Sequence, residues 1–149
     1  MKNFEDKIAV VTGGGTGMGR ELVCQLVAAG AVVAMCDVSQ ENMDETRRLA
    51  AAGEGRLSDH ICDVSSEEQV MSFRDAVLAT HQTQHINLLF NNAGIGGGGS
   101  FVEGDRGEWD RTFAVCWEGV YFGCRAFMDA LVASDEGHII NTSSVNGFW

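Results

Sequence analysis

A short apolar run that passes directly into a cluster of glycines constrains this chain more than any other stretch. Residues 8–12 read Ile-Ala-Val-Val-Thr, which is typical of a buried strand, and five of the next seven residues are glycine. Met18, Leu22, Leu26 and Ala29 then recur at helical spacing, which predicts a helix that buries this face. A strand, a glycine turn and a helix N-terminus together suit an anion, because the loop can approach a phosphate and the first helical N–H groups are unpaired.

Two well-known glycine signatures do not fit this stretch. The pattern G-x-G-x-x-G, started at Gly13, places Met18 where its third glycine belongs. The Walker pattern G-x-x-x-x-G-K-[ST] fails because Gly19 is followed by Arg20 and Glu21. The pattern that fits is T-G-x-x-x-G-x-G, from Thr12 to Gly19. A glycine turn that binds nothing remains an alternative from this stretch alone.

Composition and charge exclude several classes of protein. The chain has 149 residues, 45% of them hydrophobic and 21% charged, which is enough for one domain with a real core. A net charge of −11 argues against a nucleic-acid partner. No long apolar run or signal-peptide segment is found, so we expect no membrane partner. Its 5 cysteines form no C-x-x-C pair, which indicates a reduced, cytoplasmic protein.

Apolar runs alternate with helical patterns along the chain. Strands are expected at residues 8–12, 31–36, 56–62, 86–90 and 138–142. Helices are expected after the glycine turn, from 40 to about 52, behind the capping sequence at 65–68, and from 108 to 133. On the last helix, the predicted inner side comprises Trp109, Phe113, Trp117, Val120, Cys124, Phe127 and Leu131. This alternation predicts an α/β fold with a doubly wound parallel sheet, covered on both faces.

Unusual polar and glycine residues follow the ends of these strands. Asp37 ends the second strand, Asp63 the third, the Asn91–Gly94 turn the fourth, and Ser144 the fifth. Parallel strands end at one edge of the sheet, where open α/β sheets bind their ligands. Asp37 could accept hydrogen bonds from an adenosine ribose, although a turn or cap aspartate is the simpler alternative. Asp63, taken alone, would more often be a helix cap. The two serines after the fifth strand, taken alone, would more often form a turn.

Taken together, the glycine pattern, Asn91-Asn92-Ala93-Gly94 and Asn141-Thr142-Ser143-Ser144 resemble the short-chain dehydrogenase/reductase family. The resemblance covers the whole chain but only the N-terminal part of a family member. It implies one Rossmann-like, NAD-binding domain over residues 1–149. Its sheet would have five strands in the order 3-2-1-4-5 and be incomplete at the C-terminal side.

The resemblance also implies roles for individual residues. The cofactor would be held by Gly13, Gly15, Thr16, Gly17, Met18, Gly19, Asp37, Val38, Asp63, Val64, Asn91, Asn92, Ala93 and Gly94. Asp37 would repel a 2′-phosphate, and no basic side chain stands at Gly15, Thr16 or Val38 to neutralise one, so we predict NAD rather than NADP. Ser144 would be the catalytic serine that hydrogen-bonds the substrate oxygen.

Two departures from the family pattern affect the expected chemistry. Cys116 stands where the family usually carries an asparagine whose surroundings hold a relay water, and a thiol cannot replace an amide's hydrogen bonds. The family's proton donor is the tyrosine of Tyr-x-x-x-Lys, whereas the single tyrosine here, Tyr121, precedes Ser144, and no lysine follows Lys7. We therefore expect the acid–base pair beyond Trp149, and the 149-residue chain alone to be inactive.

The sequence thus predicts an NAD-dependent oxidoreductase that exchanges hydride with a small alcohol or ketone. The alternatives are a catalytically inactive nucleotide-binding or interaction module that ends at Trp149, and a relative of nucleotide-sugar epimerases. The bulky apolar residues of the last helix predict a homo-oligomer, expected to be a tetramer as in relatives. His81 and His85 have the spacing of two metal ligands, but no third ligand is in view and no metal is expected.

Overall fold

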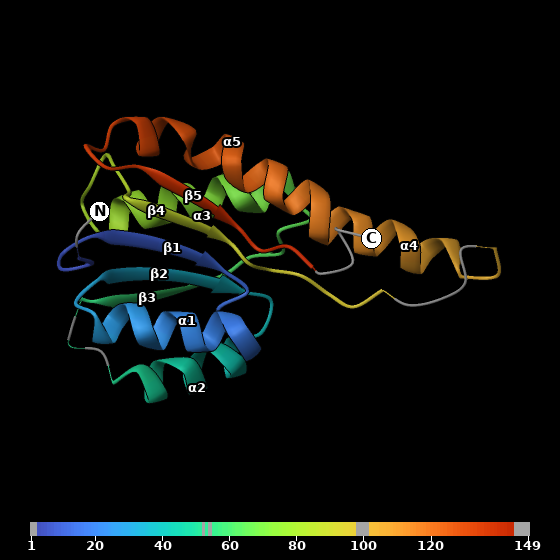
Figure 1. Cartoon of the computed structure of the whole chain (residues 1–149), viewed down its shortest axis with the longest axis horizontal. Coiled ribbons are helices and arrows are strands. Elements are labelled where there is room, and N and C mark those ends of the chain that lie inside the picture. The colour runs from blue at the N-terminus through green and yellow to red at the C-terminus, as the bar shows by residue number, and fades with distance from the viewer. Residues whose placement is uncertain (1–2, 52, 54, 98–101, 145–149) are drawn as a thin grey trace.

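The computed structural model describes residues 3–51, 53, 55–97 and 102–144 (Figure 1). Its strands are β1 (Ile8–Thr12), β2 (Val32–Asp37), β3 (Leu57–Ile61), β4 (Leu88–Asn91) and β5 (His138–Asn141). Its helices are α1 (Gly17–Ala28), α2 (Gln40–Ala50), α3 (Glu67–Thr80), α4 (Arg106–Phe113), the π-helix η1 (Ala114–Glu118) and α5 (Gly119–Val132). Each predicted strand is present, with ends that differ by at most two residues.

The strands form one parallel sheet in the order β3-β2-β1-β4-β5, which confirms the predicted α/β topology. The register pairs Val10 with Ala34 on one side and with Leu89 on the other, so β1 lies at the centre of the sheet. All five residues of β1 are buried. This explains why β1 reads as a continuous apolar run rather than an alternating one, because a strand covered on both faces has no solvent side.

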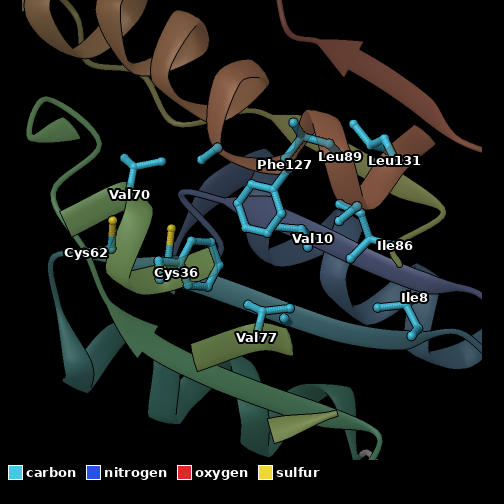
Figure 2. Packing of buried hydrophobic residues seen from close by; sticks show 14 of the residues in the cluster. Ile8, Val10, Cys36, Cys62, Val70, Val77, Ile86, Leu89, Phe127 and Leu131 are labelled. Carbon is cyan, nitrogen blue, oxygen red and sulfur yellow. The ribbon is translucent and has the colours of Figure 1, made fainter. Parts of the chain in front are cut away.

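Helices cover both faces of the sheet and enclose two separate cores. Figure 1 shows α1 and α2 on one side of the sheet and α3 and α5 on the other. Val11, Val23 and Met35 belong to the core under α1 and α2. The second core, seen from close by in Figure 2, packs Val10 and Leu89 of the sheet against Phe127 of α5, together with residues of α3. Alternate residues of β1 therefore face different cores, as the pleat of a strand requires.

Local signals fix the helix starts. Ser39 accepts a hydrogen bond from the backbone of Asn42 and is the N-cap of α2, which begins at residue 40 as predicted. Ser66 is the N-cap of α3, and its side chain accepts from the backbone of Gln69. The apolar stripe of α3, which comprises Val70, Phe73 and Val77, is buried. These caps place the beginning of each helix near the edge of the sheet where the strands end.

Two predicted buried faces were wrong in part. On α1 the buried residues include Val23 and Leu26, whereas Met18 is 62% exposed. The single helix predicted from 108 to 133 is interrupted by η1, and neither α4 nor η1 has a buried residue. Trp109, Phe113 and Trp117 are 55%, 47% and 66% exposed, while the expected burial of Phe127 and Leu131 is confirmed.

The described part of the chain contains no helix with the length and apolar character needed to cross a bilayer.

Candidate functional site

A cavity of about 750 Å³ opens at the edge of the sheet where the parallel strands end. Its walls come from the glycine turn, the segments after β2, β3 and β4, and the junction of α4 with η1. Twelve of the predicted site residues line it: Gly13, Thr16, Gly17, Met18, Gly19, Asp37, Val38, Asp63, Val64, Asn92, Ala93 and Gly94. Gly15, Asn91 and Ser144 are not among its lining residues.

The glycine turn is packed too closely for side chains at Gly13, Gly14, Gly15 and Gly19, and two of these contacts bear on the cavity. Gly13 has a φ of +68°, and a Cβ built there would lie 2.8 Å from the Cα of Ala93. A Cβ on Gly19 would overlap the carbonyl oxygen of Gly13. These contacts draw the start of α1 against the turn after β4, so glycine is needed for packing as well as for conformation.

The N-terminus of α1 is open toward the cavity. Its N-cap residue, Thr16, makes no side-chain cap hydrogen bond, in contrast to Ser39 and Ser66 on the next two helices. Space is also free at Gly17, where a Cβ would meet no atom within 4 Å. Unpaired first-turn N–H groups and the positive end of the helix dipole therefore face a space that an anionic group can enter.

Asp37 is fixed at the end of β2 by two backbone donors. Its Oδ2 accepts from the backbone N–H of Gly15 at 3.0 Å, and its Oδ1 accepts from that of Ser39 at 3.1 Å. Each carboxylate oxygen retains a lone pair, so the group can also accept hydrogen bonds from a ligand in the cavity. Gly15 therefore contributes by holding Asp37 rather than by lining the cavity itself.

One cation near the glycine turn is held by hydrogen bonds within the protein, and another borders the cavity. The guanidinium of Arg20 donates to the carbonyl oxygen of Gly15 at 2.5 Å and to Oγ1 of Thr46 at 3.1 Å. Arg111 of α4 is the one Lys or Arg among the described residues that line the cavity. The end of β2 is thus acidic, and the positive charge of the cavity wall comes from α4.

A threonine hydroxyl joins β1 to the turn after β4. Oγ1 of Thr12 accepts from the backbone N–H groups of Asn92 and Ala93, each at 3.0 Å. In return, Nδ2 of Asn92 donates to the carbonyl oxygen of Thr12 at 3.0 Å. Thr12 belongs to the recognised glycine pattern, but the sequence alone did not single it out as the residue that positions the Asn-Asn-Ala-Gly turn.

Asp63 and Val64 form the wall at the end of β3. Oδ1 of Asp63 accepts from the backbone and the hydroxyl of Ser65, at 2.9 and 2.7 Å. Val64 packs against Gly119, where a Cβ would lie 2.9 Å from its Cγ2. Asp63 therefore orders its own turn, and its second carboxylate oxygen remains available on the cavity side.

The two remaining predicted residues outside the cavity lie at the end of β4 and just beyond β5. Nδ2 of Asn91 donates to Oδ1 of Asn141 at 2.9 Å and so ties β4 to β5. The Oδ1 of Asn91 is buried without a hydrogen-bond partner in the described part of the chain, and faces the Cα side of Gly123. Ser144 is exposed just beyond β5, three residues after Asn141. The backbone N–H of Thr142 donates to the carbonyl of Asn91 at 3.0 Å, so the serine segment leaves the sheet beside the Asn-Asn-Ala-Gly turn.

Cys116 lies within the π-helix η1 beside that turn. Its Sγ is 3.5 Å from the carbonyl oxygen of Ile95, and a Cβ on Gly94 would lie 3.7 Å from the same sulfur. Short π-helical segments occur frequently at functional sites. The thiol at this position thus contacts the turn after β4, while its neighbour Val115 lines the cavity.

Sequence reasoning missed six of the lining residues: Asn42, Cys62, Ser65, Ile95, Arg111 and Val115. Cys62, Ser65 and Ile95 are chain neighbours of predicted residues, so proximity in sequence could have indicated them. Asn42, Arg111 and Val115 come from helices, and nothing in the sequence distinguishes their faces from other helical positions.

Comparison with known proteins agrees with this architecture. A family model described as short chain dehydrogenase matches residues 7–149. The SadH protein of Mycobacterium tuberculosis is 37% identical over 147 residues, which cover 99% of this chain and 52% of that protein.

Two solved structures have the same arrangement. A short chain dehydrogenase/reductase from Burkholderia phymatum in complex with NAD gives a TM-score of 0.92 at 34% identity, over 100% of this chain and 53% of that one. A metagenomic short-chain oxidoreductase in complex with NADP gives a TM-score of 0.86 at 35% identity, over 95% of this chain and 64% of that one. The chain therefore spans about half the length of the curated relatives that it matches.

Proposed function

The chain belongs to the short chain dehydrogenase family, and from this premise we propose that residues 1–149 form the NAD-binding domain of an oxidoreductase. The full-length protein would exchange a hydride between nicotinamide C4 and the carbon of a small alcohol or carbonyl substrate. The observation that supports this most strongly is the meeting, around one cavity, of the open N-terminus of α1, Asp37 and the Asn92–Gly94 turn.

The residues around the cavity fit a dinucleotide. The uncapped first turn of α1 and the free space at Gly17 suit a diphosphate, which is the anionic part of the cofactor. Asp37 suits a ribose diol, and Asp63 with Val64 suits an adenine edge, because a carboxylate accepts hydrogen bonds from hydroxyl and amino groups. When bound, the cofactor supplies the hydride chemistry, while the protein orients it and excludes water.

We propose NAD as the preferred cofactor. A 2′-phosphate beside Asp37 would bring like charges together, and the cation nearest in sequence to the glycine turn, Arg20, is engaged by Gly15 and Thr46. Relatives do not decide the matter, since one solved structure contains NAD and another NADP.

Calorimetric titration of the full-length protein with NADH and NADPH tests this. We expect NADH to bind at least about tenfold more tightly, and Asp37→Asn to weaken NADH binding and to narrow the difference between the two. Because Asp37 also holds Gly15, Ser39→Ala is a useful control: it changes the cap of α2 but retains the backbone donor to Asp37. A preference for NADPH in the unaltered protein would contradict the assignment.

Ser144 is the proposed catalytic residue within this chain. Its hydroxyl would hydrogen-bond the substrate oxygen and stabilise charge that develops there as hydride is exchanged. The exit of the serine segment beside the Asn-Asn-Ala-Gly turn supports this role. The proton must then come from another group: the hydroxyl of Tyr121 is engaged with Arg125 at 3.2 Å on the exposed side of α5. We propose that a tyrosine–lysine pair beyond Trp149 supplies it, and that the 149-residue chain alone binds cofactor without turnover.

We also propose that the protein forms a homo-oligomer, a tetramer, through α4 and α5. Trp109, Phe113 and Trp117 stand one helical turn apart and are exposed, with ring centroids 6.4 and 6.0 Å apart along the row. Such a continuous aromatic ridge is costly to leave in water.

We further propose that the protein is cytoplasmic. The cysteines of the chain are all free, which supports a reducing location.

A further inference from the structure

Two cysteines lie together beneath the cavity. Cys36 is in β2 and is fully buried, and Cys62 follows the end of β3 and is 2% exposed. Figure 2 shows both side chains pointing to the side of the sheet that α3 and α5 cover, where both belong to the same core. The backbone N–H of Cys62 donates to the carbonyl oxygen of Asp37 at 3.1 Å, so the segment that carries one thiol is bound to the end of the strand that carries the other.

The two thiols interact and are not equivalent. The interaction with the Cys36 thiol lowers the pKa of Cys62, although burial opposes the change. The same interaction, together with burial, raises the pKa of Cys36 well above its usual value. Cys62 also lines the cavity, whereas Cys36 does not. Cys62 is therefore the more nucleophilic thiol and the one that a small oxidant in the cavity meets first.

We propose that Cys36 and Cys62 form a redox-sensitive dithiol, and that its oxidation to a disulfide by a hydroperoxide weakens binding of the dinucleotide in the cavity above it. The thiolate of Cys62 attacks one peroxide oxygen, the O–O bond breaks, and an alcohol or water leaves with the other oxygen. The thiol of Cys36 then attacks the sulfenic sulfur of Cys62; the S–S bond forms, the S–O bond breaks, and water carries away the proton of Cys36. Two thiols are oxidised and one peroxide is reduced.

Formation of the disulfide must move the cavity wall. The sulfurs of a disulfide are about 2.05 Å apart, much closer than those of two thiols that are not covalently bonded. β2 is held on both sides by β1 and β3, whereas Cys62 lies past the end of β3, which is the edge strand of the described sheet. The Cys62 side therefore moves, and it takes with it the next two residues, Asp63 and Val64, which line the cavity.

The link between oxidation of the two thiols and dinucleotide binding acts in both directions. A ligand that fills the cavity covers Cys62 and requires the unmoved positions of Asp63 and Val64. A bound dinucleotide should therefore slow oxidation of the pair, and the disulfide should weaken dinucleotide binding, because coupling between two events on one protein is reciprocal. This inference rests on the proposed nucleotide-binding function.

The test treats the full-length protein with tert-butyl hydroperoxide and maps disulfides by mass spectrometry of peptides, with and without saturating NADH. We expect a Cys36–Cys62 cross-link that forms more slowly when NADH is present. Oxidation should raise the dissociation constant of NADH about tenfold, and reduction with dithiothreitol should restore it. Cys62→Ala and Cys36→Ala should each abolish the cross-link and the redox response of binding. Cys24→Ser, a change of a partly buried thiol on α1, should retain both.

The outcomes separate the two proposals. A cross-link between other cysteines, or a mapped Cys36–Cys62 disulfide that leaves the NADH affinity unchanged, would overturn the inference alone. Reduced protein that binds neither NADH nor NADPH would overturn the proposed function, and the regulatory inference with it. If one alanine variant fails to fold, the other still decides, because each removes one half of the disulfide.

Discussion

Replacement of Thr12 by valine tests whether one hydroxyl holds the site together. Valine has nearly the shape of threonine, so the change removes the hydroxyl and leaves the packing of a residue that is 4% exposed. Two backbone donors, on Asn92 and Ala93, lose an acceptor that lies 3.0 Å from each nitrogen. The bond that Thr12 donates to the carbonyl oxygen of Phe90 is also lost, but at 3.4 Å it is long.

The expected loss of stability follows from these contacts. An unsatisfied buried donor costs about 1–3 kcal/mol, and Asn92 and Ala93 are only half-buried, so water can compensate in part. We therefore expect the free energy of unfolding to fall by about 2–4 kcal/mol. The loosened turn must also be ordered again when a dinucleotide binds, and about 1 kcal/mol of ordering raises the dissociation constant about fivefold.

Urea denaturation and calorimetric titration with NADH measure the two effects. Thr80→Val is the matched control, since Thr80 is exposed at the end of α3 and the same substitution should cost less than about 0.5 kcal/mol there. The reasoning would be refuted if Thr12→Val and Thr80→Val had the same stability, or if Thr12→Val lost stability and kept its full affinity for NADH. The second result would mean that the turn after β4 does not contribute to binding.

Three further predictions concern catalysis, pH and assembly. Ser144→Ala in the full-length protein should lower kcat/KM about 10²–10³-fold and leave the dissociation constant of NADH unchanged; unaltered turnover in steady-state assays would exclude the proposed role. Burial lowers the pKa values of His60 and His81, and the unfolded chain therefore binds more protons below about pH 6.5. Urea midpoints should fall as the pH drops through that value toward the folded-state pKa values, and replacing both histidines by glutamine should flatten the decline. Trp117→Glu should convert the oligomer to smaller species in light scattering, and an unchanged mass would place the interface elsewhere.

The fold could be predicted from the sequence because its signals are local and agree with one another. The run at 8–12 is apolar throughout, and the structure buries it between two layers of helices. Ser39 caps the helix that was predicted to follow it, and Gly30 has the positive φ expected of a residue after a helix. Right-handed crossovers then leave few arrangements for strands that alternate with helices, and the observed order is one of them.

Much of the cavity wall could be predicted for a related reason. Residues that directly follow parallel strands must meet at one edge of the sheet, so Asp37, Asp63 and Asn92 were brought together by topology alone. Residues of helices carry no such constraint. Arg111 borders the cavity from the end of α4, and no pattern in the sequence shows that this part of the helix lies beside the strand ends.

The aromatic row was assigned to the wrong side because the sequence does not show where the sheet ends. A helix from 108 to 133 that packed along its whole length would bury Trp109 and Trp117 as it buries Phe127. In the structure α4 extends past the end of the sheet (Figure 1), and neither α4 nor η1 has a buried residue on any face, whereas Phe127 of α5 lies in the core. Val115 of η1 nevertheless lines the cavity, and Cys116 lies against the carbonyl oxygen of Ile95. The same stretch of chain thus carries the ridge proposed for assembly and part of the cavity wall, so a change in its backbone should impair both together.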